Sequence, residues 1–461
     1  MRRLLWVMLS MGALAAVLVA GAIWKTPDTK VSAVLQSTPP PTNTPRPTHT
    51  LPPTSPPTNT PRPSPTHTAT ATATPSPSST PTDTPTATPS PTPTLVGPNE
   101  YPENFNPLTG LPYPSEDARN RRNLIVKVSN FPEVVRPQSG LDKADIVFEY
   151  EVEGGVTRFA AIYRSQGTDF VGSIRSARLL DIELVAMFDA LLAYSGSNEW
   201  IRQYILESDW KWQALSPHLG VNCPPFCRYP QEGKAWEHTL FGNTYQMWEV
   251  AEERQVNEGH PGRGFAFSDV PDPNGEPAVD IFIDYYNKRQ DTRWQYNPAD
   301  GRYYRWNTGL PHIDAETGRQ LAADNIIVLA AEHIDRPDIY ESETGSTVIE
   351  TVLWGSGDAY VFRDGLWYRG TWWHAQGRTG LWLTHAGSDA PIHLKPGQTW
   401  VEVVRPYMWG VQVANERADM PATSAAIYAT QTQSVIQTAT AIAPYITPTP
   451  FAGTPTPVNL P

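Results

Sequence analysis

The chain has 461 residues, and its 47 acidic and 35 basic side chains give a formal net charge of −12. Proteins that grip nucleic acid through its phosphates usually present a basic face, so we expect no nucleic-acid partner. The sequence has only two cysteines, Cys223 and Cys227, which excludes a small scaffold held together by many disulfides.

The N-terminus predicts export from the cytoplasm. Arg2 and Arg3 precede an uncharged run, residues 4–24, whose length at about 1.5 Å per residue matches a hydrocarbon core of roughly 30 Å. We expect residues 1–25 to form a signal-anchor, with residues 4–24 in the cytoplasmic membrane as a single-pass helix and the rest of the chain outside the cytoplasm. The alternative is a cleaved signal peptide, because Ala20-Gly21-Ala22 resembles a cleavage site.

Two segments have almost nothing to bury. Residues 26–98 and 413–461 are rich in threonine and proline, so we expect a disordered linker and a disordered tail around a globular head. Proline favours extended polyproline II, which would make the linker a stalk between membrane and head.

The first half of the head, residues 99–267, mixes strand and helix patterns. Residues 124–130 predict a strand, and residues 144–163 predict a hairpin that alternates between a buried and a solvent-exposed face. Gly154-Gly155 is typical of a two-residue turn. With that turn, Glu151 lies opposite Arg158 and Asp145 opposite Arg164.

The hairpin also carries a row of carboxylates, Glu149, Glu151 and Glu153. One interpretation is that they form ion pairs which stabilise the register. The other is that they line a site for acid–base chemistry or a divalent cation. Strand spacing alone does not decide between them, and we predict no metal site.

The stretch VGSIRSAR, residues 171–178, is the strongest candidate for a binding site. We expect a strand over 170–174 and a helix from Leu179, which places Arg175, Ser176 and Arg178 at the junction. Guanidinium groups at a helix N-terminus favour an anion, and Arg136 and Arg158 are expected to converge there. Alternatively, Arg175 and Arg178 pair with nearby carboxylates and hold the turn. The glycine spacing of a phosphate-binding loop is missing, so we expect no nucleotide and no other cofactor.

The two cysteines occur together in CPPFC. Outside the cytosol, Cys223 and Cys227 are expected to form a local disulfide. A metal site would need further ligands in a tight pattern, which the neighbouring sequence does not show.

After a boundary rich in proline at 268–278, residues 279–412 predict strands throughout. Asp300-Gly301 and Asp364-Gly365 are hairpin signals. The expected fold class is therefore α+β: a mixed α/β N-terminal module followed by an all-β C-terminal module. Several tryptophans either fill the β core or stack on sugar rings. They are Trp354, Trp367, Trp372, Trp373 and Trp382.

Six segments occur in order along the head: FNPLTGLP (105–112), RPQSGLDKADIVFEYEVEGGVTRF (136–159), VGSIRSAR (171–178), YNPADGRYYRW (296–306), YVFRDGLWYRGTW (360–372) and LKPGQTWVEVV (394–404). Together they resemble the YerB-like lipoprotein family of the bacterial cell envelope. The resemblance implies an envelope location and a head of two parts, with no established reaction and no catalytic residues to carry over. Members typically carry a lipid-modified cysteine after the signal, whereas no cysteine precedes Cys223 here.

Two functions are consistent with the sequence. The first is a membrane-anchored binding or scaffold protein that recognises a wall polymer, an anionic ligand or an envelope protein. The alternative is an enzyme that acts on a phosphate-bearing envelope substrate through the arginine cluster. No GxSxG or HExxH signature is present, so no catalytic residue is assigned and the binding protein is favoured.

Overall fold

The computed structural model describes residues 94–260, 262–285, 290–341 and 346–420. All of them lie in the compact unit formed by Ala87–Pro461. The predicted membrane segment 4–24 and most of the two Thr/Pro-rich segments lie outside the described residues. Within the described ranges, no helix is long and apolar enough to cross a membrane.

The first half of the head contains the α-helices and about half of the central sheet. Its helices are α1 (Glu116–Asn120), α2 (Leu179–Phe188), α3 (Glu199–Glu207) and α4 (Thr244–Glu253). Its main strands are β4 (Asn123–Ser129), β5 (Ile146–Val152), β6 (Val156–Tyr163), β7 (Val171–Gly172), β8 (Ala190–Ala193) and β9 (Ala214–Leu215). Shorter strands are β1 (Leu95–Val96), β2 (Phe105–Asn106), β3 (Leu111–Pro112), β10 (Phe226–Arg228), β11 (Leu240–Gly242) and β12 (Ala266–Ser268).

The second half is built from strands, and its described residues contain no α-helix. The strands are β13 (Glu276–Pro277), β14 (Asp280–Asp284), β15 (Asp291–Asn297), β16 (Arg302–Asn307), β17 (Leu310–Pro311), β18 (Ala322–Ala323), β19 (Asn325–Ala330), β20 (Glu332–Tyr340), β21 (Thr347–Val352), β22 (Gly355–Arg363), β23 (Leu366–His374), β24 (Trp382–His385), β25 (His393–Leu394), β26 (Thr399–Val404) and β27 (Val411–Ala414). The head as a whole is therefore a mixed, β-rich fold.

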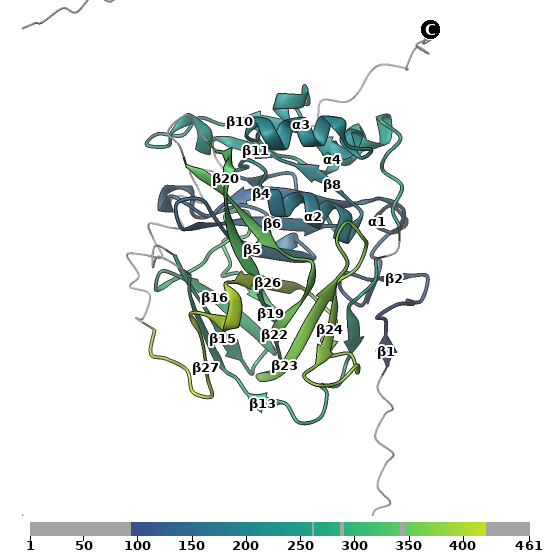
Figure 1. Ribbon diagram of the computed structural model, residues 1–461, viewed down its shortest axis with the longest axis vertical. Helices are drawn as coiled ribbons and strands as arrows, with labels where there is room; N and C mark the ends of the chain where they lie inside the picture. The colour runs from purple at the N-terminus through teal and green to yellow at the C-terminus, as the bar shows by residue number, and fades with distance from the viewer. Residues whose placement is uncertain (1–93, 261, 286–289, 342–345, 421–461) are drawn as a thin grey trace, which may run out of the picture. The chain divides into compact units, whose positions relative to one another are not determined.

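One sheet runs through both halves of the head. Its eleven strands follow the order β13-β23-β22-β19-β26-β5-β6-β4-β8-β9, with β24 paired to β23. The halves meet where β26 lies parallel to β5, with Thr399 beside Ile146 and Val403 beside Tyr150 (Figure 1). Main-chain hydrogen bonds therefore join segments that are about 250 residues apart.

Each face of this sheet carries a hydrophobic core to which both halves contribute. On one face, Phe148 of β5 belongs to the same buried cluster as Leu184 of α2 and Val401 of β26. On the other face, Val147 clusters with Trp294 and Trp400. Because side chains alternate along a strand, neighbouring residues of β5 supply the two cores.

Two predictions for the hairpin are wrong. All seven residues of β5 are buried, so the strand has no solvent-exposed face, because cores cover the sheet on both sides. The register is shifted by one residue, since Val152 pairs with Val156 and the loop has three residues rather than two.

The shift changes which side chains face each other. Glu151 lies opposite Thr157, and Tyr150 takes the place opposite Arg158. Asp145 accepts hydrogen bonds from the backbone N–H groups of Arg164 and Ser165 at 2.6 and 2.8 Å, so it closes the strand end.

Candidate functional site

The segment VGSIRSAR runs beside the last residues of β4, where Val128 forms an antiparallel bridge with Ile174. The strand is shorter than predicted, and α2 begins at Leu179 as expected. The backbone N–H of Arg175 donates to the carbonyl of Lys127 at 3.0 Å, and the N–H of Ser195 donates to the carbonyl of Arg175 at 3.0 Å. These bonds hold Arg175 between the end of β4 and the loop that follows β8.

A pocket of about 270 Å³ opens beside this segment. It is lined by Arg175, Ser176, Ser195, Gly196, Ser197, Asn198, His218, Arg228, Glu237 and Glu341. Two guanidinium groups and several hydroxyl and amide groups therefore converge there. Of its two carboxylates, Glu341 is paired with Arg178 at 2.6 Å.

Three arginines in or next to the pocket donate hydrogen bonds to main-chain carbonyls. Arg158 donates to Ser176 at 2.9 Å, Arg175 to Glu237 at 3.2 Å and Arg228 to Trp236 at 2.7 Å. Among the described residues, none of the three has a carboxylate oxygen within 4.0 Å. Burial, together with the neighbouring Arg178 and Arg175, lowers the pKa of Arg158 to about 9. Glu237 also lines the pocket and interacts electrostatically with Arg175 and Arg228, but it lies beyond ion-pair distance of both.

Arg178 behaves differently from Arg175. Its guanidinium pairs with Glu153 and Glu341, each at 2.6 Å, and it is almost completely buried. Its backbone N–H donates to the Asp181 carboxylate at 2.6 Å, so a side chain of the protein already occupies the start of α2. These contacts fit the alternative interpretation, in which Arg178 pairs with nearby carboxylates and stabilises the turn.

The sequence reasoning missed a buried polar group around Lys127, whose carbonyl accepts from the backbone N–H of Arg175. The Lys127 ammonium lies 3.1 Å from Asp181 and donates to the hydroxyl of Tyr150, which itself donates to Asp181 at 2.6 Å. Burial lowers the pKa of Lys127 to about 8, although Asp181 opposes that shift. The single lysine inside the apolar run LIVKVSN could have indicated a buried charged group.

Arg136 does not join this cluster. Its guanidinium donates to the Asn130 side chain at 3.3 Å, to the Asn130 carbonyl at 3.0 Å and to the Thr308 hydroxyl at 3.4 Å. It lines a different pocket, which contains residues of both halves of the head.

The three glutamates of the ladder do not share a site. Each has its own arginine: Glu149 pairs with Arg305, Glu151 with Arg405 at 3.0 Å, and Glu153 with Arg178. Arg305 and Arg405 come from the second half of the chain, which no local pairing rule indicates. The first two ion pairs therefore connect the halves.

The pair of Glu149 and Arg305 lies at the centre of a buried network. Neither side chain is exposed to solvent. Glu149 also accepts from Thr157 at 2.5 Å and from Asn130 at 3.0 Å. The Arg305 guanidinium lies over the rings of Phe159, Trp294 and Trp400, with centroid distances of 5.4, 5.4 and 4.9 Å.

Glu402 of β26 belongs to the same network. It accepts from the Tyr285 hydroxyl at 2.6 Å and from the Trp294 indole at 2.8 Å. Burial and the nearby Glu149 together raise its pKa to about 8, although Arg305 opposes the shift. Glu402 is therefore protonated at neutral pH.

This raised pKa predicts a pH-dependent effect of Glu402→Gln. The neutral form of Glu402 stabilises the fold below the unfolded pKa, and that contribution is lost as pH rises through about 8. We expect the variant to equal the wild type at about pH 4 and to be more stable at about pH 9, with a difference of roughly 1 kcal/mol or more. Urea denaturation across this range measures the difference, and a gap that does not change with pH would contradict the assignment.

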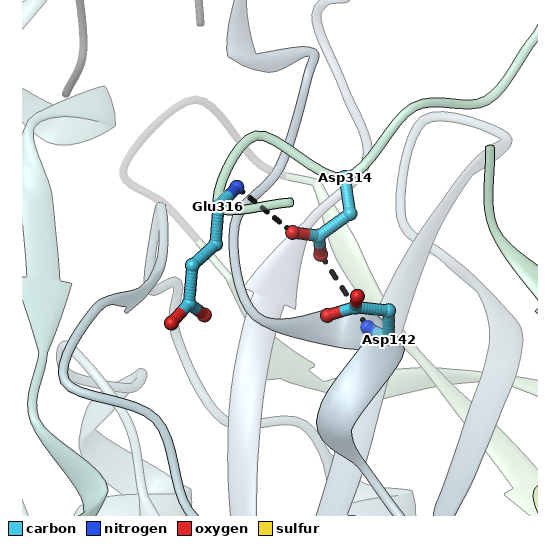
Figure 2. A group of neighbouring side chains, drawn as sticks. All are labelled: Asp142, Asp314 and Glu316. Atoms are coloured by element: carbon cyan, nitrogen blue, oxygen red, sulfur yellow. Dashed lines mark hydrogen bonds between the residues drawn. The ribbon is translucent and has the colours of Figure 1, made fainter. Parts of the chain in front are cut away.

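A cluster of three carboxylates, Asp142, Asp314 and Glu316, lies elsewhere between the halves (Figure 2). Asp314 accepts from the backbone N–H groups of Leu141 at 2.8 Å and Glu316 at 2.9 Å. Burial raises the pKa of Asp314 to about 7, and Asp142 adds to the shift. Glu316 pairs with Lys143 and accepts from Thr168 at 2.7 Å, and Asp142 pairs with Arg319 at 3.2 Å. The cluster thus connects the two halves by hydrogen bonds and ion pairs.

The two cysteines are paired, and the tryptophans differ in how far they are buried. Cys223 and Cys227 form a disulfide immediately before Arg228. Trp367 and Trp372 belong to the buried cores, with 9% and 2% of their surface exposed. Trp373 is 48% exposed, and its ring lies 4.8 Å from that of the partly buried Trp382.

The chain belongs to a family of two modules. Residues 108–257 match the N-terminal domain of a protein family of unknown function, DUF3048, and residues 281–401 match the C-terminal domain of the same family. The resemblance to the YerB-like family is thereby confirmed.

YerB of Bacillus subtilis (strain 168), which is named as a lipoprotein, is similar to this chain. The two are 28% identical over 321 residues, which cover 65% of this chain and 85% of YerB. The crystal structure of the Bacillus subtilis YerB protein matches with a TM-score of 0.56 and 27% identity, over 67% of this chain and 99% of the other.

Proposed function

We propose that this protein is a binding protein of the bacterial cell envelope, and that its head holds an oxyanion in the pocket beside Arg175. An envelope location is supported by the relative named as a lipoprotein and by the apolar run at 4–24. In this proposal residues 4–24 anchor the chain in the cytoplasmic membrane, and the Thr/Pro-rich linker carries the head outside.

One observation supports the binding role most strongly. Arg158, Arg175 and Arg228 lie together and donate to carbonyls, without a carboxylate of the described residues within ion-pair distance. Guanidinium groups bind carboxylate and phosphate through strong charge-assisted hydrogen bonds, so an oxyanion would satisfy Arg175 and Arg228, which line the pocket. Ser195 and Ser197 line the same pocket and offer hydroxyl groups to the ligand.

The ligand class follows from the pocket. A volume of about 270 Å³ accommodates a phosphate or carboxylate group together with a small part of a larger molecule. We therefore propose an anionic group of a wall polymer or of another envelope component as the ligand. An enzyme acting on a phosphate-bearing substrate would use the same arginines.

The test is binding of phosphate and pyrophosphate to Arg175→Ala. A hydrogen bond to a charged group contributes about 1.5–3 kcal/mol, so we expect affinity to fall by about tenfold or more. Calorimetric titration of the wild type and the variant measures this loss. Arg202→Ala is the matched control, because Arg202 is exposed and pairs only locally with Glu199.

Equal affinity in the wild type and Arg175→Ala would refute the site. Turnover of a phosphodiester or pyrophosphate substrate that is lost in Arg175→Ala would instead establish the enzyme.

A further inference from the structure

A second pocket, of about 170 Å³, lies where the two halves of the head meet. It is lined by Glu133, Arg136, Pro137, Asn307, Thr308, Leu310, Pro311, His312 and Ile313. The first three residues belong to the N-terminal half and the others to the hairpin of β16 and β17 and the residues after it.

Asn307 is the most informative residue of this pocket. Its side chain is only 3% exposed, yet neither its amide nitrogen nor its amide oxygen has a hydrogen-bond partner among the described residues. Leaving a buried polar atom unpaired costs about 1–3 kcal/mol, so a side chain with both atoms unpaired calls for a partner that enters the pocket. An acceptor group in the pocket would pair with the amide nitrogen.

His312 defines a second contact. Its Nε2 lies 2.6 Å from the Gln138 amide oxygen, while its Nδ1 is buried without a partner in the described ranges. The Gln138 amide nitrogen donates to the Ser129 carbonyl, so the amide oxygen accepts from Nε2 and Nδ1 is an acceptor. Burial holds the pKa of His312 well below its usual value, and Arg305 and Arg136 lower it further.

Arg136 places a positively charged guanidinium group in the lining of this pocket. It donates to Asn130 and Thr308, which are neutral, and no carboxylate oxygen of the described residues lies within ion-pair distance. Glu133 is exposed at the rim of the pocket. The guanidinium can therefore bind a carboxylate while Asn307 donates to the same group.

We infer that this pocket binds a small carboxylate that carries a neutral O–H or N–H donor next to the carboxyl group. The carboxylate lies against Arg136 and Asn307, and the donor points to Nδ1 of His312. An ammonium donor is disfavoured, because Arg136 and Arg305 repel a cation at this position. The site is independent of the pocket beside Arg175 and of the function proposed for it.

The test titrates the full chain, purified in mild detergent, with glycolate, N-acetylglycine and acetate. Glycolate offers an O–H donor, N-acetylglycine an N–H donor, and acetate neither, so the first two distinguish a hydroxy acid from a peptide C-terminus. We expect at least one donor-bearing acid to bind about tenfold more tightly than acetate, because the donor satisfies His312.

Two variants test the residues. Asn307→Leu removes two unpaired polar atoms, so we expect an unchanged or raised melting temperature together with about a tenfold or greater loss of affinity. Arg136→Lys keeps the charge but loses the planar fork, and we expect weaker binding without unfolding. Arg175→Ala is the control and should bind these acids like the wild type. Equal affinity for acetate and both donor-bearing acids, or unchanged binding by Asn307→Leu, would overturn the inference.

Discussion

Arg305→Ala is expected to lower the free energy of unfolding by about 3–5 kcal/mol, because it leaves a buried carboxylate without its counter-charge. Glu149 and Arg305 are both fully buried, and the guanidinium also contacts the Thr292 hydroxyl at 3.0 and 3.1 Å. Removing it also opens space between the rings of Trp294 and Trp400. Such a loss is a large part of the stability of an ordinary domain.

Urea denaturation measures this effect, with Arg202→Ala as the control for loss of an exposed arginine. The double variant Glu149→Gln with Arg305→Met separates charge from packing. Because it removes both charges and keeps the volume, we expect it to be more stable than Arg305→Ala alone. A loss below about 1 kcal/mol for Arg305→Ala would show that Glu149 does not need this partner.

The second large effect concerns the two halves of the chain. Residues 94–267 produced alone are expected not to fold, although they contain the whole N-terminal family domain. Without the second half, β5 loses its parallel neighbour β26, and Val147 loses the core that contains Trp294 and Trp400. An exposed, apolar strand edge also favours aggregation.

Circular dichroism and amide exchange of the fragment measure its folding. Co-expression with residues 268–420 is the matched control, and we expect the two fragments to form a folded complex. A cooperative melting transition of residues 94–267 alone would contradict the shared-sheet argument.

Local patterns predicted the elements well where chemistry between neighbours decides the outcome. Asp364-Gly365 closes the hairpin of β22 and β23 as expected, because both residues take positive φ. The disulfide of Cys223 and Cys227 is present, as was expected for a location outside the cytosol. The turn at Gly154-Gly155 was predicted one residue too short, because glycine allows several loops and only cross-strand packing selects one.

The candidate site was predicted only in part. Arg158, Arg175 and Ser176 do lie together. Arg228 also lines the pocket, but it comes from a strand about 50 residues away in which no sequence pattern indicated a binding residue. Arg136 lies in another pocket, and Arg178 is held by two carboxylates, one of them Glu341 from the second half. An arginine can pair with any carboxylate that the fold brings near it, and spacing in the sequence does not say which.

The sequence by itself indicated the two modules, the family, the helix start at Leu179 and the turn at Asp364-Gly365, because turn residues and hydrophobic periodicity act over a few positions. The tertiary structure alone decided that β5 and β26 join the modules into one sheet. It also placed Arg305 against Glu149 and left the side chain of Asn307 unpaired. The physical reason is that long-range pairing depends on packing and burial in three dimensions, for which residues 250 positions apart leave no local pattern.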